Sequence, residues 1–194
     1  MGLAATETLY SVGDYWKIER SSEIKHEYDD GEIYAMAGGS YPHNRISTNA
    51  TIALGVALRG KKCFAANSDQ QVAVSRSKYV YPDVSVICGR FEAYEEHPNA
   101  AKNPMVIVEV LSPDTESYDR GGKFMRYRQI DTFREYVLVS QTEVLIEVFY
   151  KNELGFWEIG TYQQLTDSIF LKSIEITLIV SDLYEGLELP TNND

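Results

Sequence analysis

The sequence contains two apolar, strand-like runs that each carry a single acidic residue. The runs are YVYPDVSVIC, which holds Asp83, and MVIVEVLS, which holds Glu109. Both are apolar at nearly every position, a pattern typical of strands covered on both faces of a sheet. Burying an unpaired carboxylate is costly, so an acid in such a strand is usually paired with a cation or bound to a metal ion. The fold must therefore supply a cationic partner for both acids.

The polar segment after the second run, SPDTESYDRGGKFMRYRQ, contains one lysine, Lys123. Two acids on consecutive strands and one lysine form a residue set suited to metal-dependent phosphodiester cleavage. A hard ion such as Mg²⁺ or Mn²⁺ prefers oxygen ligands and lowers the pKa of an attacking water. We expect Asp83 and Glu109 to bind this ion with the carbonyl oxygen of Val110, and a helix to bring Lys123 to the developing negative charge. The alternative interpretation takes each residue on its own: each acid is then a strand-end or salt-bridge residue, and Lys123 is a solvent-exposed lysine.

Two further polar residues are candidates for the same site. His43 stands in the first turn of a predicted helix, where it could ligate the metal or contact a phosphate, or serve only as a surface or capping residue. Glu32 follows a predicted hairpin turn and could either close the site or act as a strand-edge charge. Zinc bound by His and Cys is disfavoured because no spacing supports it. A serine hydrolase is disfavoured because there is no G-x-S-x-G elbow.

The charge is unevenly distributed along the chain. The net charge of -11 argues at first against a nucleic-acid partner. Residues 43–78, however, hold six basic residues against one acidic, and residues 119–135 hold five against three. These segments bracket the acid-bearing runs, and we expect Arg45, Arg120 and Arg126 to contact DNA. Homodimerisation is also expected, because a two-fold pair can serve both strands of a duplex.

Composition is that of an ordinary globular protein, with 44% hydrophobic and 24% charged residues. The two cysteines, Cys63 and Cys88, form neither a disulfide framework nor a CxxC metal pattern, which favours a reducing, cytoplasmic setting. No apolar run approaches the roughly 18–20 residues that a membrane span needs, so we expect no membrane association.

Periodicity and turn residues predict an α/β fold with a mixed sheet. Asp30-Gly31 between alternating runs is a strong hairpin signal. The predicted helices cover 11–20, 43–58 and 119–129, with a helical stretch at 91–96 and a short helix or turn at 179–187. The predicted strands cover 24–29, 32–37, one or two within 62–74, both acid-bearing runs, 135–139, 144–150, 155–162 and 169–178. We expect one domain over 1–194, with 1–40 as an N-terminal helix and hairpin extension and 43–187 as the core.

These motifs resemble those of the PD-(D/E)XK nuclease superfamily: Pro82-Asp83, then Glu109-Val110-Leu111, with Leu111 at the usual lysine position. The run VIVEVLSPDTESYDRGGKFMRYRQ, followed by REYVLVS, closely resembles the Uma-type family of restriction-endonuclease-like proteins, and DGEIYAM and PHNRI also fit it. The resemblance covers most of the chain. It implies a restriction-endonuclease-like core, magnesium-type metal dependence and a lysine displaced onto the following helix, here Lys123.

The leading interpretation is a Mg²⁺-dependent endonuclease that hydrolyses DNA phosphodiester bonds with Asp83, Glu109 and Lys123. An alternative is a catalytically inactive nuclease-fold module that binds nucleic acid or protein, which is motivated by Leu111 and by the acidic composition. A small-molecule hydrolase acting through the same carboxylates is the least favoured interpretation.

Overall fold

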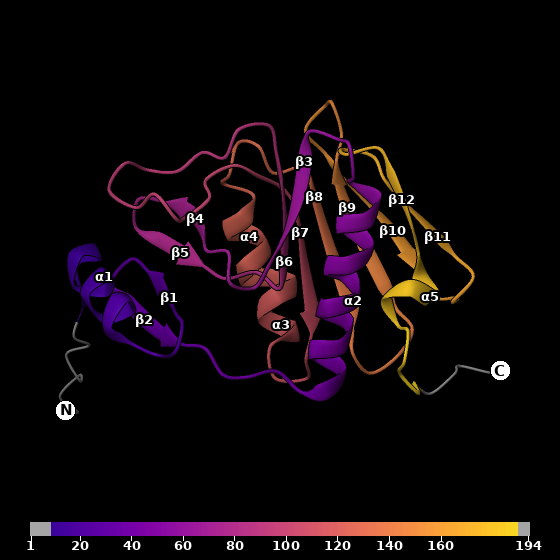
Figure 1. Cartoon of the computed structure of the whole chain (residues 1–194), viewed down its shortest axis with the longest axis horizontal. Helices are drawn as coiled ribbons and strands as arrows, with labels where there is room; N and C mark the ends of the chain where they lie inside the picture. The colour runs from indigo at the N-terminus through magenta and orange to yellow at the C-terminus, as the bar shows by residue number, and fades with distance from the viewer. Residues whose placement is uncertain (1–8, 190–194) are drawn as a thin grey trace, which may run out of the picture.

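A six-stranded mixed sheet forms the centre of the computed structural model, which describes residues 9–189 (Figure 1). All neighbouring strands are antiparallel except β7 and β8, which run parallel. This confirms the predicted mixed sheet. Its strands, in spatial order, are β10 (Trp157–Tyr162), β9 (Ile146–Lys151), β8 (Glu135–Ser140), β7 (Pro104–Leu111), β6 (Val84–Cys88) and β3 (Cys63–Asn67).

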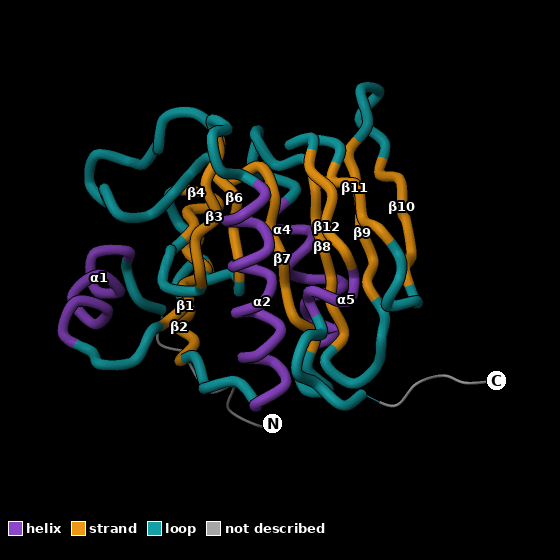
Figure 2. Tube along the Cα trace, turned by 45° about the vertical axis from the view of Figure 1, so that its right-hand side comes forward, coloured by secondary structure: helices purple, strands orange, loops and turns teal. Residues whose placement is uncertain are grey.

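Alternate residues of β7 enter two different apolar clusters. Val106, Val108 and Val110 pack with α2 (Tyr41–Ala57) and with the small hairpin of β11 (Ser168–Leu171) and β12 (Ile176–Ile179), beside α5 (Val180–Leu183). Ile107 and Leu111 face the opposite side and pack with Tyr127, Ile130 and Phe133. Figure 2 shows α2 lying over the sheet, roughly along its strands. Both faces of the sheet are therefore covered, as the apolar runs predict.

The opposite face is covered by a helical segment with an irregular centre. It consists of α3 (Glu116–Tyr118), the π-helical turn η1 (Asp119–Lys123) and α4 (Phe124–Tyr127). The sequence predicted one regular helix over 119–129, which is wrong in its start and in its centre. The adjacent glycines Gly121 and Gly122 lie inside the π-helical turn, where the weak helix propensity of glycine favours a departure from α geometry.

A second sheet of four strands holds the N-terminal hairpin. Its spatial order is β2 (Glu32–Ala35), β1 (His26–Asp29), β5 (Lys78–Val80) and β4 (Val72–Ser75). Asp30 and Gly31 join β1 to β2 with φ of 47° and 112°, the two positive values that a type I′ turn requires. Next to this sheet, α1 (Val12–Ser21) places Tyr15 against Tyr28 and Tyr79, so three tyrosines form a small apolar cluster.

The capping residues of two predicted helices explain where they begin. Ser11 accepts a hydrogen bond from the backbone N–H of Asp14 at the start of α1. Ser40 accepts one from the N–H of His43, so α2 begins at Tyr41, two residues before the predicted start. The helical stretch predicted at 91–96 is wrong. An isolated bridge between Tyr94 and His97 stands there, in a turn.

The two cysteines are joined in a disulfide, which corrects the expectation that they stay unpaired. Cys63 on β3 and Cys88 on β6 lie directly opposite each other, with a Cα–Cα distance of 4.0 Å. Only the strand pairing brings them together, since they are 25 residues apart in sequence. Within residues 9–189, no helix is both long and apolar enough to cross a bilayer.

Candidate active site

Glu109 lies within β7 on the face covered by η1 and α4, and only 2% of the residue is exposed. Its Oε1 accepts a hydrogen bond of 2.6 Å from the hydroxyl of Tyr127 and lies 2.9 Å from Nζ of Lys123. Burial raises the pKa of Glu109 to about 8, although the nearby lysine opposes the rise. The buried carboxylate is thus held by one cation, one hydroxyl donor and, at 3.4 Å from its Oε2, the backbone N–H of Asp83.

Asp83 stands immediately before β6, where the pairing of Val84 with Val108 brings it beside Val110 of β7. Its Oδ2 accepts a hydrogen bond of 2.8 Å from the N–H of Val110 and lies 3.2 Å from Nε2 of His43. Burial acts to raise the pKa of Asp83, but His43, Lys123 and the amide of Val110 together lower it below its ordinary value. Asp83 therefore remains an anion beside the neighbouring Glu109.

Lys123 reaches the sheet from the last residue of the π-helical turn, and its side chain is only 10% exposed. Besides Glu109, the carboxylate of Asp119 lies 3.5 Å from Nζ, and that of Glu27 on β1 lies 4.0 Å away. Burial acts to lower the pKa of Lys123, but the three carboxylates raise it well above its ordinary value. The ammonium group is therefore charged and surrounded by acids.

These residues line one cavity of about 490 Å³. The three predicted catalytic residues, Asp83, Glu109 and Lys123, all contribute to its wall, as do Val110 and His43. Glu32 is not part of that lining as far as the described residues go. It contacts the hydroxyl of Tyr34, and it is Tyr34 that lines the cavity. The structure thus brings together every predicted candidate for catalysis and metal binding except Glu32.

Three residues around the site were missed from the sequence. Glu27 is 9% exposed, and its Oε1 accepts a hydrogen bond from the N–H of Tyr81. Asp119 is 3% exposed, and burial raises its pKa above the ordinary value. Tyr127 donates to Glu109. Only Asp119 had a signal in the sequence. It stands four residues before Lys123, and in a helical segment this spacing places the two side chains on the same side.

The arginines expected to contact DNA all make internal contacts. Arg45 donates from Nε to the carbonyl oxygen of Glu185 at 3.0 Å, away from the cavity lining. Arg126 contacts the carboxylate of Asp29 and the hydroxyl of Tyr118.

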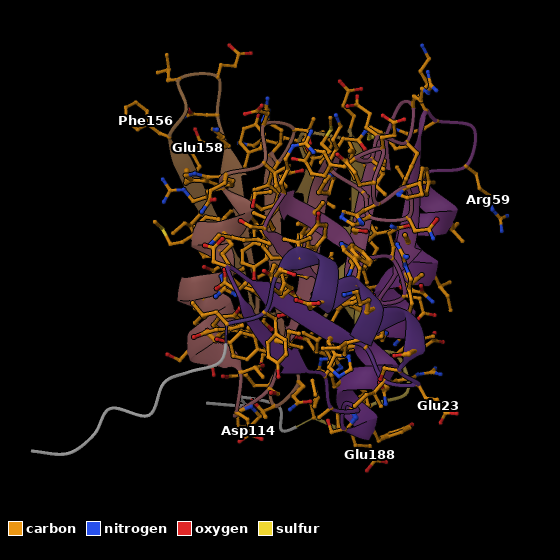
Figure 3. All side chains as sticks on the ribbon, turned by 90° about the vertical axis from the view of Figure 1, so that its left-hand side faces the viewer. Glu23, Arg59, Asp114, Phe156, Glu158 and Glu188 are labelled. Carbon is orange, nitrogen blue, oxygen red and sulfur yellow. A yellow bond between two sulfur atoms is a disulfide. The ribbon has the colours of Figure 1, made fainter. Side chains whose placement is uncertain are left out.

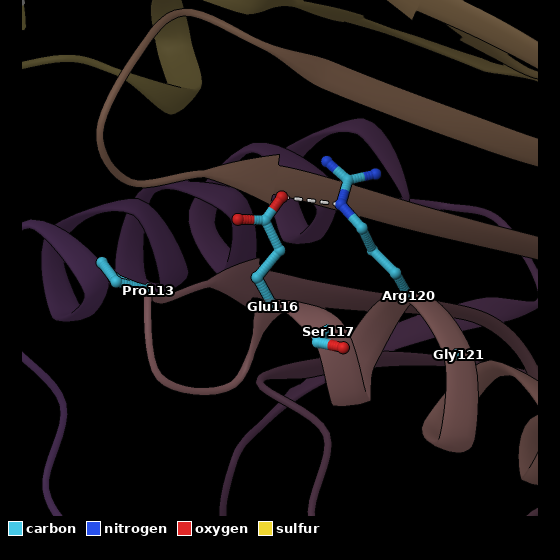
Figure 4. Close-up of a pocket in the computed structure, with 5 residues that line it drawn as sticks. All are labelled: Pro113, Glu116, Ser117, Arg120 and Gly121. Carbon is cyan, nitrogen blue, oxygen red and sulfur yellow. Dashed lines mark hydrogen bonds and ion pairs between the residues drawn. The ribbon is translucent and has the colours of Figure 1, made fainter.

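Arg120 is also satisfied within the protein. Its Nε lies 2.7 Å from a carboxylate oxygen of Glu116, and its guanidinium also contacts Glu147. Figure 4 shows Arg120 beside Glu116 in a shallow surface pocket that Pro113, Ser117 and Gly121 complete.

The donors of the cavity are oxygen atoms of the kind that a hard divalent cation prefers. Among the described residues, five acidic side chains line the cavity against Lys123 and His43, so negative charge is in excess. No set of three or more His, Cys, Asp or Glu side chains within residues 9–189 is arranged to hold a metal ion. Two carboxylates with a backbone carbonyl would leave several positions to water, which is how Mg²⁺ is commonly bound.

The chain was compared with protein-family models, with known sequences and with solved structures. The model of the Uma2 family, described as "Putative restriction endonuclease", matches residues 12–181. Two uncharacterized proteins of Synechocystis are 41% and 30% identical to the chain. Both alignments cover 91% of the chain, and they cover 92% and 96% of the relatives. A crystal structure described as a putative nuclease belonging to DUF820, from Anabaena variabilis, superposes with a TM-score of 0.72 at 16% identity, covering 90% of this chain and 97% of that one. The fold is therefore that of this structure.

Proposed function

The chain belongs to the Uma2 family, and from this premise we propose that it is a metal-dependent endonuclease that hydrolyses DNA phosphodiester bonds. The observation that carries the proposal is the convergence of Asp83, Glu109 and Lys123 in one cavity. Asp83 immediately precedes β6, Glu109 lies within β7 and Lys123 ends the π-helical turn. Burying these charged groups together costs free energy of folding. Buried titratable groups with perturbed pKa values in a cavity are typical of catalytic sites.

Asp83 and Glu109 would hold Mg²⁺ or Mn²⁺, with the carbonyl oxygen of Val110 as a further ligand. When bound, such an ion would neutralise the phosphate and lower the pKa of the attacking water. Lys123 would keep its positive charge next to the reacting phosphate, because the carboxylates around it raise its pKa. There it would stabilise the negative charge that develops during attack.

His43 would hold the carboxylate of Asp83 in position. Its Nε2 lies 3.2 Å from Oδ2 of Asp83, and this contact raises the pKa of the imidazole above its ordinary value. Proposed roles for His43 are to orient Asp83 and to meet a phosphate oxygen at the cavity mouth. Tyr127 has the corresponding positioning role for Glu109 through its hydroxyl.

The proposed enzyme works as a homodimer, in which each subunit offers one site. Sedimentation at micromolar concentration tests the dimer, and a mass of 22.0 kDa would contradict it.

Incubation with circular DNA tests the activity directly. Purified protein is mixed with a closed duplex circle and with a single-stranded circle, each with Mg²⁺, with Mn²⁺ or with a chelator. We expect metal-dependent conversion of at least one circle to nicked or linear product, because only an endonuclease opens a circle. Asp83→Asn and Glu109→Gln should each lower the rate at least about 100-fold. Cutting that persists in both variants, or no cutting of either circle, contradicts the proposal.

A non-catalytic module is the second candidate, and one observation favours it. Leu111 occupies the usual lysine position and is 4% exposed in the apolar cluster around Tyr127. If the Lys123–Glu109 pair is only structural, DNA binding should persist without metal-dependent cutting. A salt series of binding measurements then gives a negative slope from the phosphate contacts, with no product on a gel.

A further inference from the structure

We propose that the cavity accepts an unpaired DNA strand, a single strand or a frayed end, rather than intact duplex. The inference rests on the proposed nuclease function and concerns the form of the substrate. It holds equally for a monomer or a dimer, because each site handles one strand. The argument has three independent parts: the depth of the reactive groups, the aromatic side chains around them and the charge of the cavity.

The acids are recessed at the floor of the cavity. Glu109 is 2% exposed, and the side chains of Asp83 and Lys123 are 16% and 10% exposed. The volume of about 490 Å³ lies within the range of pockets for small ligands, roughly 300–1,000 Å³. A stacked duplex cannot enter such a space. An unpaired strand can bend one phosphate down to the recessed groups, whereas a duplex is stiff and holds its phosphates on its outer edge.

Two chain segments enclose the cavity. Residues 35–40, which join β2 to α2, line one side, and residues 112–115, together with Tyr118 and Asp119, line the other. Figure 1 shows the β2–α2 connection passing along the same end of the molecule as α3. Ser40 donates a hydrogen bond of 2.6 Å from its hydroxyl to Oε1 of Gln141, which fixes the connection to the end of β8. The enclosing connection is therefore tied down at its α2 end.

Aromatic and apolar side chains stand around the recessed acids. Tyr34 and Tyr118 line the cavity and are 48% and 37% exposed, and Met36 lies between the strand and the connection. The ring of Tyr118 is held by the guanidinium of Arg126, whose centre is 5.1 Å from the ring centroid. Exposed rings beside a phosphate-cleaving site suit unstacked bases, since aromatic rings bind single strands by stacking without regard to sequence.

The charge of the cavity opposes binding of a duplex backbone. Lys123 is the one Lys or Arg that lines the cavity among the described residues, and five acids line it as well. The expected DNA contacts Arg120 and Arg126 are engaged by carboxylates. Duplex affinity depends on neutralising many phosphates, so a duplex gains little here. A single strand that stacks on Tyr34 and Tyr118 needs fewer basic contacts.

Binding and cleavage of three labelled oligonucleotides test the inference. A single strand, a blunt duplex of the same sequence and a duplex with one unpaired arm are titrated with the full chain in Ca²⁺, followed by fluorescence anisotropy. We expect the single strand and the armed duplex to bind at least about tenfold more tightly than the blunt duplex. In Mn²⁺, cleavage should fall within the unpaired parts. Equal or tighter binding of the blunt duplex, or cuts within paired DNA, would overturn it.

A pair of alanine variants connects the preference to the cavity. Tyr34→Ala should weaken single-strand binding about tenfold and leave blunt-duplex binding unchanged, because stacking contributes this much per base. Phe156→Ala is the matched control, since Phe156 is 67% exposed and Figure 3 shows it at the opposite end of the molecule from Asp114 of the cavity. Equal losses in both variants would contradict a role for Tyr34.

The experiments distinguish failure of the proposed hydrolysis from failure of the proposed preference for an unpaired strand. If the single strand binds preferentially but no oligonucleotide is cut, the substrate form stands and hydrolysis is wrong. If the duplex is cut in an Asp83-dependent manner as fast as the single strand, hydrolysis stands and the substrate form is wrong. Circular dichroism of each variant confirms that the fold is intact before these comparisons are made.

Discussion

Nζ of Lys123 lies 2.9 Å from Oε1 of Glu109, and both side chains are buried between the sheet and the helical segment that covers it. Lys123→Met keeps much of the side-chain volume and removes the charge. Burial already raises the pKa of Glu109 to about 8, and loss of the ammonium raises it further, so the carboxyl is protonated at pH 7 and loses a buried hydrogen-bond partner. We expect the free energy of unfolding to fall by about 1–3 kcal/mol at pH 7. DNA cleavage should fall about 10²–10³-fold. Urea unfolding and a cleavage assay measure the two effects.

The double variant Glu109→Gln/Lys123→Met serves as the control for this pair. It replaces both ionisable partners, so most of the lost stability should return although activity does not. A single Lys123→Met variant as stable as the wild type would show that the ion pair is not what satisfies Glu109.

Gly122 faces the ring of Tyr118 across the π-helical turn. A Cβ at Gly122 would lie 2.9 Å from Cδ2 of that ring, whereas one at Gly121 would meet open space. We expect Gly122→Ala to lower the free energy of unfolding by about 1–3 kcal/mol and to reduce cleavage by displacing Lys123. Gly121→Ala should be neutral or stabilising by up to about 1 kcal/mol. Thermal unfolding of the two variants compares them, and equal effects would contradict this account of the turn.

The pKa of His43 should lie above its ordinary value of 6.5 in metal-free protein, because Nε2 is hydrogen-bonded to Asp83. The pKa of His97 should be lowered by burial, beside the ring of Trp16. A raised histidine pKa stabilises the fold fully below pH 6.5, and this contribution is lost as the pH rises through the folded value. Proton NMR titration measures both histidines.

Asp83→Asn tests the cause of the shift, and should return the pKa of His43 towards 6.5 or below while leaving that of His97 unchanged. A His43 pKa that does not respond to this substitution would rule out Asp83 as the cause.

The disulfide between Cys63 and Cys88 should contribute stability without affecting the site. It joins the far end of β6, while Asp83 precedes the first residue of that strand. Reduction releases a crosslink over 25 residues of sequence, so the free energy of unfolding should fall by about 2–4 kcal/mol. Cleavage by the folded protein should not change. Thiol titration before and after reduction checks the bond, and the variant Cys63→Ser/Cys88→Ser should be insensitive to reductant.

Local sequence signals predicted much of the fold. Asp30 and Gly31 specified their hairpin because a type I′ turn needs two residues that tolerate positive φ. Ser11 stands where the first helix begins, since its side chain can accept from the first free N–H groups. Ser40 does the same for α2 but was not identified as its cap, so that helix was predicted to start two residues late. The prediction at 91–96 failed because spacing alone cannot distinguish a short helix from a compact turn.

Asp83 and Glu109 were selected from the sequence alone, because a charge inside an apolar strand has no packing explanation. Lys123 was selected as the one lysine of the polar segment that follows them. Where these groups meet was decided by tertiary structure. Strand pairing places Asp83 against Val110 and Cys63 opposite Cys88, and the π-helical turn aims Lys123 at Glu109. Glu27 enters from a different sheet, so no local pattern indicates its place beside Lys123. Residue type fixes the cost of burying a charge, but long-range packing selects the partner that offsets it.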